Sequence, residues 1–384
     1  MLHEDQVAMI HRLLRHINDG TTSYAETTAA NPVSSYTCTE RLAQERQHLF
    51  RDRPLFLGLS ARVKEPGDFF TEDVAGMPVL VTRDRDGRVR AFLNVCSHRG
   101  APVAEGAGHA SRFTCRYHAW TYGLDGALRG VPDARSFEGL DKSCNGLTEL
   151  PSAEIAGLLF VVPATDPANA PAIDTANHLH GLEKDLGTFG FGNFHHYRSL
   201  TIERRMNWKL SPETFMEGYH LQYLHSASVG PIFYSNLMLL DEFGPHSRLT
   251  LPRRRITDLA DRPESEWDLV PETAIIYTLF PNVTMVSQAG HVEMWRSYPH
   301  PTDPARCRVE VSVFTPNAVE TEKAKRFYEK NIDLAILTVD GEDFTLSEKI
   351  QAGHAARAHE SLVYGRNEPA LIHYHRSLRA ALAA

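Results

Sequence analysis

Two cysteines and two histidines have the types and the spacing of a metal centre. Cys96 and His98 are followed, after sixteen residues, by Cys115 and His118, so two short segments each supply one thiol and one imidazole. Zinc binds such a set, but a zinc finger takes both thiols from one knuckle and both histidines from a helix. One Cys and one His from each of two loops suit a [2Fe–2S] cluster, with two thiolates on one iron and two imidazoles on the other. The four residues predict this cluster, and zinc is the alternative.

A second set of metal-binding side chains lies further along the chain. Glu213, Glu217 and His220 follow the i, i+4, i+7 spacing of one helix face, and we predict a helix over residues 215–224. His225 is five residues past His220 and would point about 140° away on a regular helix. Both imidazoles reach one metal only if the helix distorts or ends between them, so we predict an overwound turn there. Two histidines and one carboxylate leave positions open on an iron for dioxygen and substrate, and that carboxylate must come from elsewhere.

Short β-strands must position the first set of ligands. Asp-Gly pairs at residues 86–87 and 125–126 predict hairpin turns, and apolar residues 158–162 predict a further strand. Residues 163–171, rich in Pro, Ala and Asp, predict a linker between two domains. Helical spacing of apolar residues between positions 7 and 17 predicts an N-terminal helix.

The residues after this linker mix both kinds of element. Residues 275–295 and 307–314 predict strands, and residues 320–339 predict a helix. We therefore expect an α+β protein with an N-terminal helical segment, a small β domain and a larger mixed domain. The expected bounds are, in that order, 1–44, 45–163 and 164–384.

Composition excludes several classes of protein. The 384 residues include 40 Lys and Arg against 48 Asp and Glu, a formal net charge of −8, which is the opposite of a nucleic-acid-binding balance. The five cysteines are too few and too irregularly spaced for a disulfide framework. The sequence has no apolar run long enough to span a membrane, and its first residues lack the basic start and apolar core that are typical of a signal peptide. We expect a cytoplasmic protein with neither a nucleic-acid nor a membrane partner.

Residues 94–128, NVCSHRGAPVAEGAGHASRFTCRYHAWTYGLDGAL, resemble a Rieske iron–sulfur domain. With the Glu/His segment, the resemblance extends to the catalytic (alpha) subunits of the Rieske non-haem iron, ring-hydroxylating oxygenases. It implies a small all-β Rieske domain and a larger START-like (helix-grip) catalytic domain with an antiparallel sheet. It also implies Cys96 and Cys115 on one iron of the cluster, and His98 and His118 on the outer iron.

The same resemblance implies the ligands of a mononuclear Fe(II). His220 and His225 would be joined by a carboxylate from a later helix, where the family has an Asp eight residues before a Gln. Asp343 stands eight residues before Gln351 and fits this pattern, with the adjacent Glu342 as the competing carboxylate.

Glu217 is implied as a bridge between the two iron centres. It would accept hydrogen bonds from a ligand histidine of its own subunit and from a cluster histidine of a neighbouring subunit, which orients both rings. The resemblance therefore implies a head-to-tail ring, usually a homotrimer, with or without a small β subunit.

The implied activity is that of a terminal oxygenase. O₂ and electrons from NAD(P)H, delivered by a separate flavin reductase with or without a ferredoxin, would hydroxylate a small organic substrate. The sequence has no G-x-G-x-x-G nucleotide fingerprint, so the reductase must be another protein. We expect an aromatic or alicyclic substrate. The alternatives are oxidative demethylation of a quaternary amine or methyl ether, and a Rieske electron carrier without a second iron. We expect the substrate pocket to be lined by apolar and aromatic residues of the sheet, among them Phe233, Tyr277, Met285 and Trp295.

Overall fold

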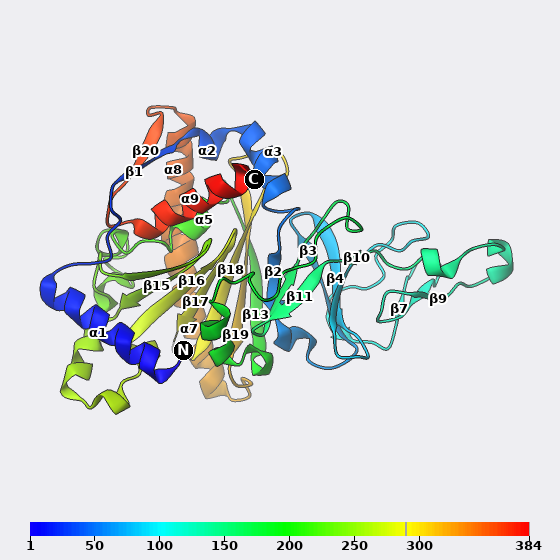
Figure 1. Cartoon of the computed structure of the whole chain (residues 1–384), viewed down its shortest axis with the longest axis horizontal. Helices are drawn as coiled ribbons and strands as arrows, with labels where there is room; N and C mark the ends of the chain where they lie inside the picture. Colours follow the sequence, from blue (N-terminus) through cyan, green and yellow to red (C-terminus); the bar gives the residue numbers. More distant parts are fainter. Residues whose placement is uncertain (289, 384) are drawn as a thin grey trace. The chain divides into compact units, whose positions relative to one another are not determined.

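The computed structural model describes residues 1–288 and 290–383 (Figure 1). The chain divides into two compact units, which we describe separately. The smaller unit comprises residues 47–178 and 190–193, and the larger comprises 1–46, 179–189 and 194–384. Within the described residues, no helix combines the length and the apolar character needed to cross a bilayer.

The smaller unit is built from three antiparallel sheets, in the strand orders β10-β5-β4-β3-β6, β11-β12-β2 and β7-β8-β9. The strands are β2 (Leu55–Leu59), β3 (Asp68–Val74), β4 (Met77–Arg83), β5 (Val89–Leu93), β6 (Ala107–His109), β7 (Phe113–Thr114), β8 (Thr121–Tyr122), β9 (Leu128–Gly130), β10 (Glu149–Leu150), β11 (Ser152–Ile155) and β12 (Leu158–Val161). Both predicted hairpins are confirmed, as β4–β5 and β8–β9. Gly126 turns the second hairpin at φ +77°, and a Cβ there would lie 2.4 Å from the Phe92 ring, so no other residue fits.

A seven-stranded antiparallel sheet, in the order β13-β19-β18-β17-β16-β15-β14, is the framework of the larger unit. The strands are β13 (His195–Arg204), β14 (Leu239–Phe243), β15 (His246–Pro252), β16 (Thr273–Leu279), β17 (Val283–Gln288), β18 (His291–Pro299) and β19 (Cys307–Thr315). All seven residues of β16 are buried, which indicates that both faces of the sheet are covered at its centre. The α+β class, with an all-β unit and a larger antiparallel-sheet unit, is confirmed.

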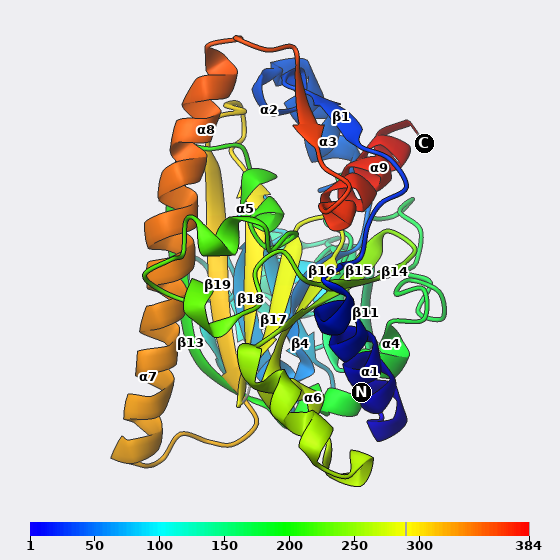
Figure 2. The same cartoon turned by 90° about the vertical axis from the view of Figure 1, so that its left-hand side faces the viewer.

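Helices pack around this sheet. They are α1 (His3–Asp19), α2 (Ser34–Thr37), α3 (Thr39–His48), α4 (Glu183–Leu186), α5 (Leu210–Glu213), α6 (Leu269–Glu272), α7 (Glu322–Ile336), α8 (Thr345–Ala355) and α9 (Pro369–Ala383), and a small sheet pairs β1 (Ala29–Pro32) with β20 (Ser361–Tyr364). Figure 2 shows α7 continuing into α8 as one long helical run beside the sheet. The residues between them, Leu337–Phe344, form a π-helix, in which each turn holds more than the usual 3.6 residues. The predicted helices near residues 7–17 and 320–339 are confirmed as α1 and α7.

Two buried polar networks hold the segment that follows β13. Lys209 is fully buried, and its ammonium group donates to both carboxylate oxygens of Glu45 at 2.8 and 2.9 Å. Four residues further on, Glu213 accepts hydrogen bonds from the Tyr36 hydroxyl at 2.8 Å and from His375 Nε2 at 2.9 Å. Because these partners come from both ends of the chain, the segment is anchored before it reaches the candidate ligands.

Candidate active site

Three predicted metal ligands converge in the larger unit. One ligand atom from each of His220, His225 and Asp343 lies within 4.8 Å of the others. The Asp343 carboxylate oxygen is 3.0 Å from His225 Nε2 and 3.7 Å from His220 Nε2. His225 and Asp343 are buried and His220 is partly exposed, so the cluster opens on one side. Two imidazoles and one carboxylate in this arrangement could hold a divalent metal and leave positions free.

Two further carboxylates orient the imidazoles from behind. His220 Nδ1 donates to Glu217, and His225 Nδ1 donates to Glu342 Oε2 at 2.5 Å. In each ring the other nitrogen, Nε2, therefore faces Asp343. Metal-bound histidines are oriented in the same way, with one nitrogen on the metal and the other hydrogen-bonded to an acceptor. Glu342 and Asp343, adjacent in sequence, contact opposite nitrogens of the same ring. This geometry separates the two competing carboxylates, with Asp343 on the side that could hold the metal.

The loop that carries both histidines differs from the helix we predicted. Helix α5 ends at Glu213, and residues 215–224 contain only one short 3₁₀ turn, His220–Gln222. The Glu217 carboxylate accepts hydrogen bonds from the backbone N–H groups of residues 219 and 220, which competes with helical bonding. The predicted helix and its single polar stripe are wrong, and Glu213 belongs to the buried network instead. The overwound turn between the two histidines is confirmed.

The loop closes directly after His225. The backbone N–H of Gly230 donates to the His225 carbonyl at 2.9 Å, and a Cβ at Gly230 would lie 2.4 Å from the Leu221 carbonyl oxygen. Only glycine permits this approach. Gln351, which marked the carboxylate helix in the sequence, has a structural role: its amide accepts from the Asn207 N–H at 3.0 Å and donates to the Tyr36 carbonyl at 3.1 Å.

Burial and mutual charge control protonation of the three candidate ligands. Burial raises the pKa of Asp343. Burial opposes protonation of His225, but hydrogen bonds and charges from Asp343 and Glu342 outweigh it and raise the pKa of His225. An Asp and a His that share a proton in the metal-free chain form a site where a divalent cation can take the proton's place.

We expect Glu342→Gln to weaken iron binding by about 10- to 100-fold, because the amide cannot anchor His225 Nδ1 as a charged acceptor does. Iron retained after graded dialysis against a chelator measures the effect. Glu348→Gln is the control, since Glu348 accepts the Arg205 backbone N–H at 2.8 Å and contacts neither histidine. Equal iron loss in both variants would contradict the orienting role of Glu342.

A cavity of about 280 Å³ opens beside the three ligands. Its walls are mostly apolar and come from the histidine loop, from β15 to β18 and from α7. Phe233 lines it as expected, whereas Tyr277, Met285 and Trp295 do not. Side chains alternate between the two faces of a strand, and the neighbours Ile276 and Val286 face the cavity.

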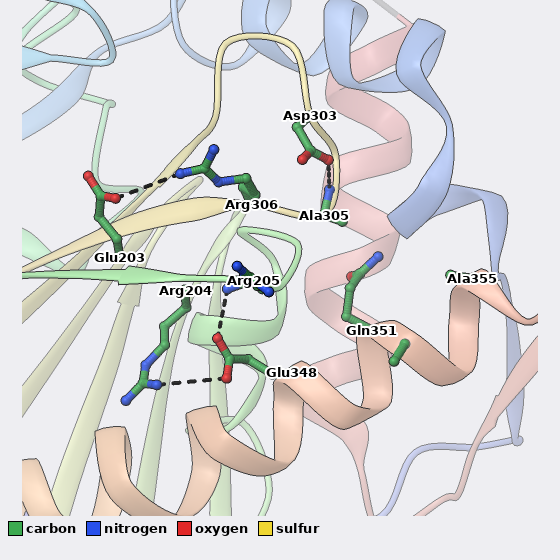
Figure 3. A pocket seen from close by; sticks show the side chains of 10 residues that line it. Glu203, Arg204, Arg205, Asp303, Ala305, Arg306, Glu348, Gln351 and Ala355 are labelled. Carbon is green, nitrogen blue, oxygen red and sulfur yellow. Dashed lines mark hydrogen bonds and ion pairs between the residues drawn. The ribbon is translucent and has the colours of Figure 1, made fainter.

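A different hollow of about 720 Å³ lies between the end of β13, the loop at residues 303–306 and α8 (Figure 3). Its charged side chains pair with one another, since Arg204 and Glu348, and Arg306 and Glu203, approach to 3.8 Å. None of the predicted ligands lines it, so we do not assign it to catalysis.

The smaller unit brings the other four predicted ligands onto neighbouring loops. Cys96 and Cys115 are buried free thiols, and the rings of His98 and His118 lie 4.6 Å apart at their centroids. His98 Nδ1 is buried without a hydrogen-bond partner. An orphaned buried nitrogen beside a second imidazole and two free thiols fits a cluster with two sulfur and two nitrogen ligands.

Tyr122 was not predicted as a functional residue. Its hydroxyl lies 3.1 Å from Cys96 Sγ and accepts the backbone N–H of Ser97 at 3.1 Å. Burial, and then the bond to Cys96, raise the pKa of Tyr122 to about 12, so the phenol stays protonated at neutral pH and can donate to a thiolate. Tyr122 stands seven positions after Cys115, and nothing in that spacing indicates a hydrogen bond to a cluster ligand.

We expect Tyr122→Phe to lower the reduction potential of the cluster by tens of millivolts, because a hydrogen bond to sulfur favours the more negative, reduced form. A redox titration followed in the visible spectrum measures the shift. Tyr117→Phe is the control, since Tyr117 is exposed and contacts His118 and Arg99 through its ring, at 3.8 and 5.1 Å, so the change removes a hydroxyl and keeps both ring contacts. A potential unchanged in Tyr122→Phe, or lowered equally in both, would contradict the assignment.

Family models match both units. Residues 54–151 match the Rieske [2Fe-2S] domain, and residues 191–384 match the ring hydroxylating alpha subunit (catalytic domain). The second match covers half of the chain.

Characterised relatives span most of the chain. Choline monooxygenase of Spinacia oleracea is 28% identical over 91% of this chain and 78% of its own length. The large oxygenase component of the naphthalene 1,2-dioxygenase system of Pseudomonas aeruginosa is 28% identical over 69% of this chain and 66% of its own. The crystal structure of a quaternary ammonium Rieske monooxygenase shares the fold, with a TM-score of 0.79 at 21% identity, over 93% of this chain and 96% of the other.

Proposed function

Because the chain belongs to the ring hydroxylating alpha subunit family and contains a Rieske domain, we propose that it is the terminal oxygenase of a multicomponent system. It is an oxidoreductase of the Rieske non-haem iron oxygenase class, with a Rieske [2Fe–2S] cluster and a mononuclear iron as cofactors. The observation that carries the proposal is the convergence of His220, His225 and Asp343 beside an apolar cavity.

We assign the ligands residue by residue. Cys96 and Cys115 would bind one iron of the cluster, and His98 and His118 the other, which the orphaned nitrogen of His98 supports. The proposed ligands of the mononuclear iron are His220, His225 and Asp343. Residues 45–163 would form the cluster domain and residues 164–384 the catalytic domain, with residues 1–44 as an N-terminal helical segment.

The side chains around the mononuclear site have separable tasks. When bound, the cluster would supply single electrons, and the iron held by His220, His225 and Asp343 would supply the oxygen-activating chemistry. Glu217 and Glu342 hold protons at Nδ1 of His220 and His225, which leaves each Nε2 unprotonated for a metal. The apolar walls exclude water and hold a carbon skeleton against the open side of the ligands.

The partners follow from the family. An alpha subunit works in a multimer with a separate reductase, and we propose a homotrimer supplied from NAD(P)H by a flavin reductase, with or without a ferredoxin. Glu217 would then contact a cluster histidine of the neighbouring subunit. We also propose a cytoplasmic location, supported by five cysteines that are all unpaired. We propose neither a nucleic-acid nor a membrane partner.

We propose hydroxylation of a small aromatic or alicyclic compound, for which the apolar cavity is the support. Oxidative demethylation of a quaternary amine is the second candidate, favoured by the choline monooxygenase relative. Phe215 and Phe233 line the cavity and could hold a cationic methylammonium group on their ring faces.

Metal analysis of anaerobically purified protein tests the proposal. We expect about three irons and about two acid-labile sulfides per chain on a red-brown protein. Two irons and two sulfides, unchanged after reconstitution with ferrous iron, would instead indicate an electron carrier.

A further inference from the structure

Arg253 is the single Arg or Lys among the described residues that line the cavity. It follows the last residue of β15 and forms an isolated bridge with Phe233, whose ring its guanidinium faces at 5.2 Å. The side chain is partly buried, so its charge lies where little water can solvate it.

The described part of the chain provides no carboxylate within 4.0 Å of this guanidinium. Its hydrogen bonds go to neutral acceptors, the Gln288 amide oxygen at 3.1 Å and the Thr273 carbonyl at 3.4 Å. Burial, and then the nearby Arg255, lower the pKa of Arg253, and the charge of Glu272, a carboxylate already paired with Arg255 at 2.7 Å, only partly offsets them. A guanidinium still stays protonated at neutral pH, because arginine is the most basic of the side chains. A partly buried cation whose own hydrogen bonds all go to neutral acceptors is stabilised when an anion joins it.

Glu293, a buried acid that lines the cavity together with Glu217 and Asp343, is already engaged. Its carboxylate accepts hydrogen bonds from the Gln288 amide nitrogen at 3.2 Å, from His291 Nε2 at 3.0 Å and from Trp295 Nε1 at 3.0 Å. These bonds turn the amide so that its nitrogen faces Glu293 and its oxygen faces Arg253. Gln288 is thus a positioning residue, which keeps the guanidinium directed at the cavity.

We propose that Arg253 binds a carboxylate of the substrate, so that this oxygenase acts on an organic acid rather than on a neutral hydrocarbon or a simple cation. A guanidinium accepts a carboxylate through two parallel hydrogen bonds, which would fix one end of the substrate and leave its apolar part toward His220 and Asp343. The inference rests on the proposed oxygenase function and specifies its substrate class.

Two classes of carboxylate substrate fit the two candidate reactions. An aryl carboxylate would combine Arg253 with hydroxylation of a ring. A trimethylammonium carboxylate, such as a betaine, would combine it with demethylation, with its cationic end against the aromatic rings. Choline, which has the same cationic end and no carboxylate, is excluded as the preferred substrate on this proposal.

The test measures binding of paired probes to the iron-loaded holoenzyme by calorimetry. The pairs are benzoate with benzamide, and glycine betaine with choline, so that each pair differs mainly in the carboxylate. We expect the carboxylate of at least one pair to bind roughly 10- to 100-fold more tightly than its partner, and Arg253→Gln to abolish that difference. Arg253→Lys should restore part of it, because it returns the charge without the planar fork.

Controls separate this inference from the proposed function and from misfolding. Arg254→Gln changes an exposed neighbouring guanidinium outside the cavity lining and should leave both affinities unchanged. Each variant must keep the cluster spectrum and the iron content of the parent. If the parent binds or oxidises choline or benzamide at least as well as the carboxylates, or binds none of the four probes, the role of Arg253 is overturned. A chain that holds only two irons after reconstitution overturns the oxygenase function itself.

Discussion

Asp343→Ala removes the mononuclear iron and lowers turnover on the order of 10³-fold or more, while the cluster and its visible spectrum remain. The carboxylate is buried and lies within contact distance of Nε2 of both histidines, so its loss removes one of the three proposed ligands. Iron per chain, measured with acid-labile sulfide, should fall from about three to about two.

Asp340→Asn is the matched control. Asp340 lies on the same π-helical segment, but its carboxylate pairs with Arg204 at 2.6 Å and is not near the histidines. This variant should keep its iron. If Asp343→Ala also keeps a full complement of iron and its activity, the third ligand is another group, and Glu342 is the first to examine.

Glu217→Gln should slow electron transfer between the two centres by roughly 10- to 100-fold without removing either of them. The amide is isosteric but uncharged, so it cannot balance a proton on His220 Nδ1 as the carboxylate does. The reduced protein is mixed rapidly with oxygen and substrate, and reoxidation of the cluster is followed in the visible spectrum.

Glu213→Gln is the comparison for this experiment. It makes the same chemical change four residues earlier, in a carboxylate bonded to Tyr36 and His375. We expect this variant to lose stability yet to reoxidise its cluster at the parental rate. A slow phase in both variants, or in neither, would contradict the bridging role of Glu217.

Prediction from the sequence succeeded where chemistry imposes local spacing. The Asp-Gly turns predicted both hairpins, and the five-residue interval between His220 and His225 predicted a break in the helix. It failed for the rest of that loop, because the spacing of Glu213 and Glu217 imitates a helix face. Long-range partners decide the outcome: Tyr36 and His375, far away in sequence, engage Glu213.

The cavity could not be predicted for a related reason. A one-residue difference in register decides which face of a strand a side chain occupies, and the sequence shows alternation without showing which face is open. Arg253 is followed directly by Arg254 and Arg255, and the sequence does not show which of the three side chains faces the cavity. Only the sheet places it beside Gln288 and Phe233.

The position of Asp343 depends on the π-helical winding of the segment Leu337–Phe344. If the same residues wound as a regular α-helix, Asp343 would turn away from the histidines by about 100° or more around the helix axis. The helix would then be more regular and the metal set incomplete. A substitution that favours regular α-helical winding in this segment would therefore disrupt the metal site without changing a ligand.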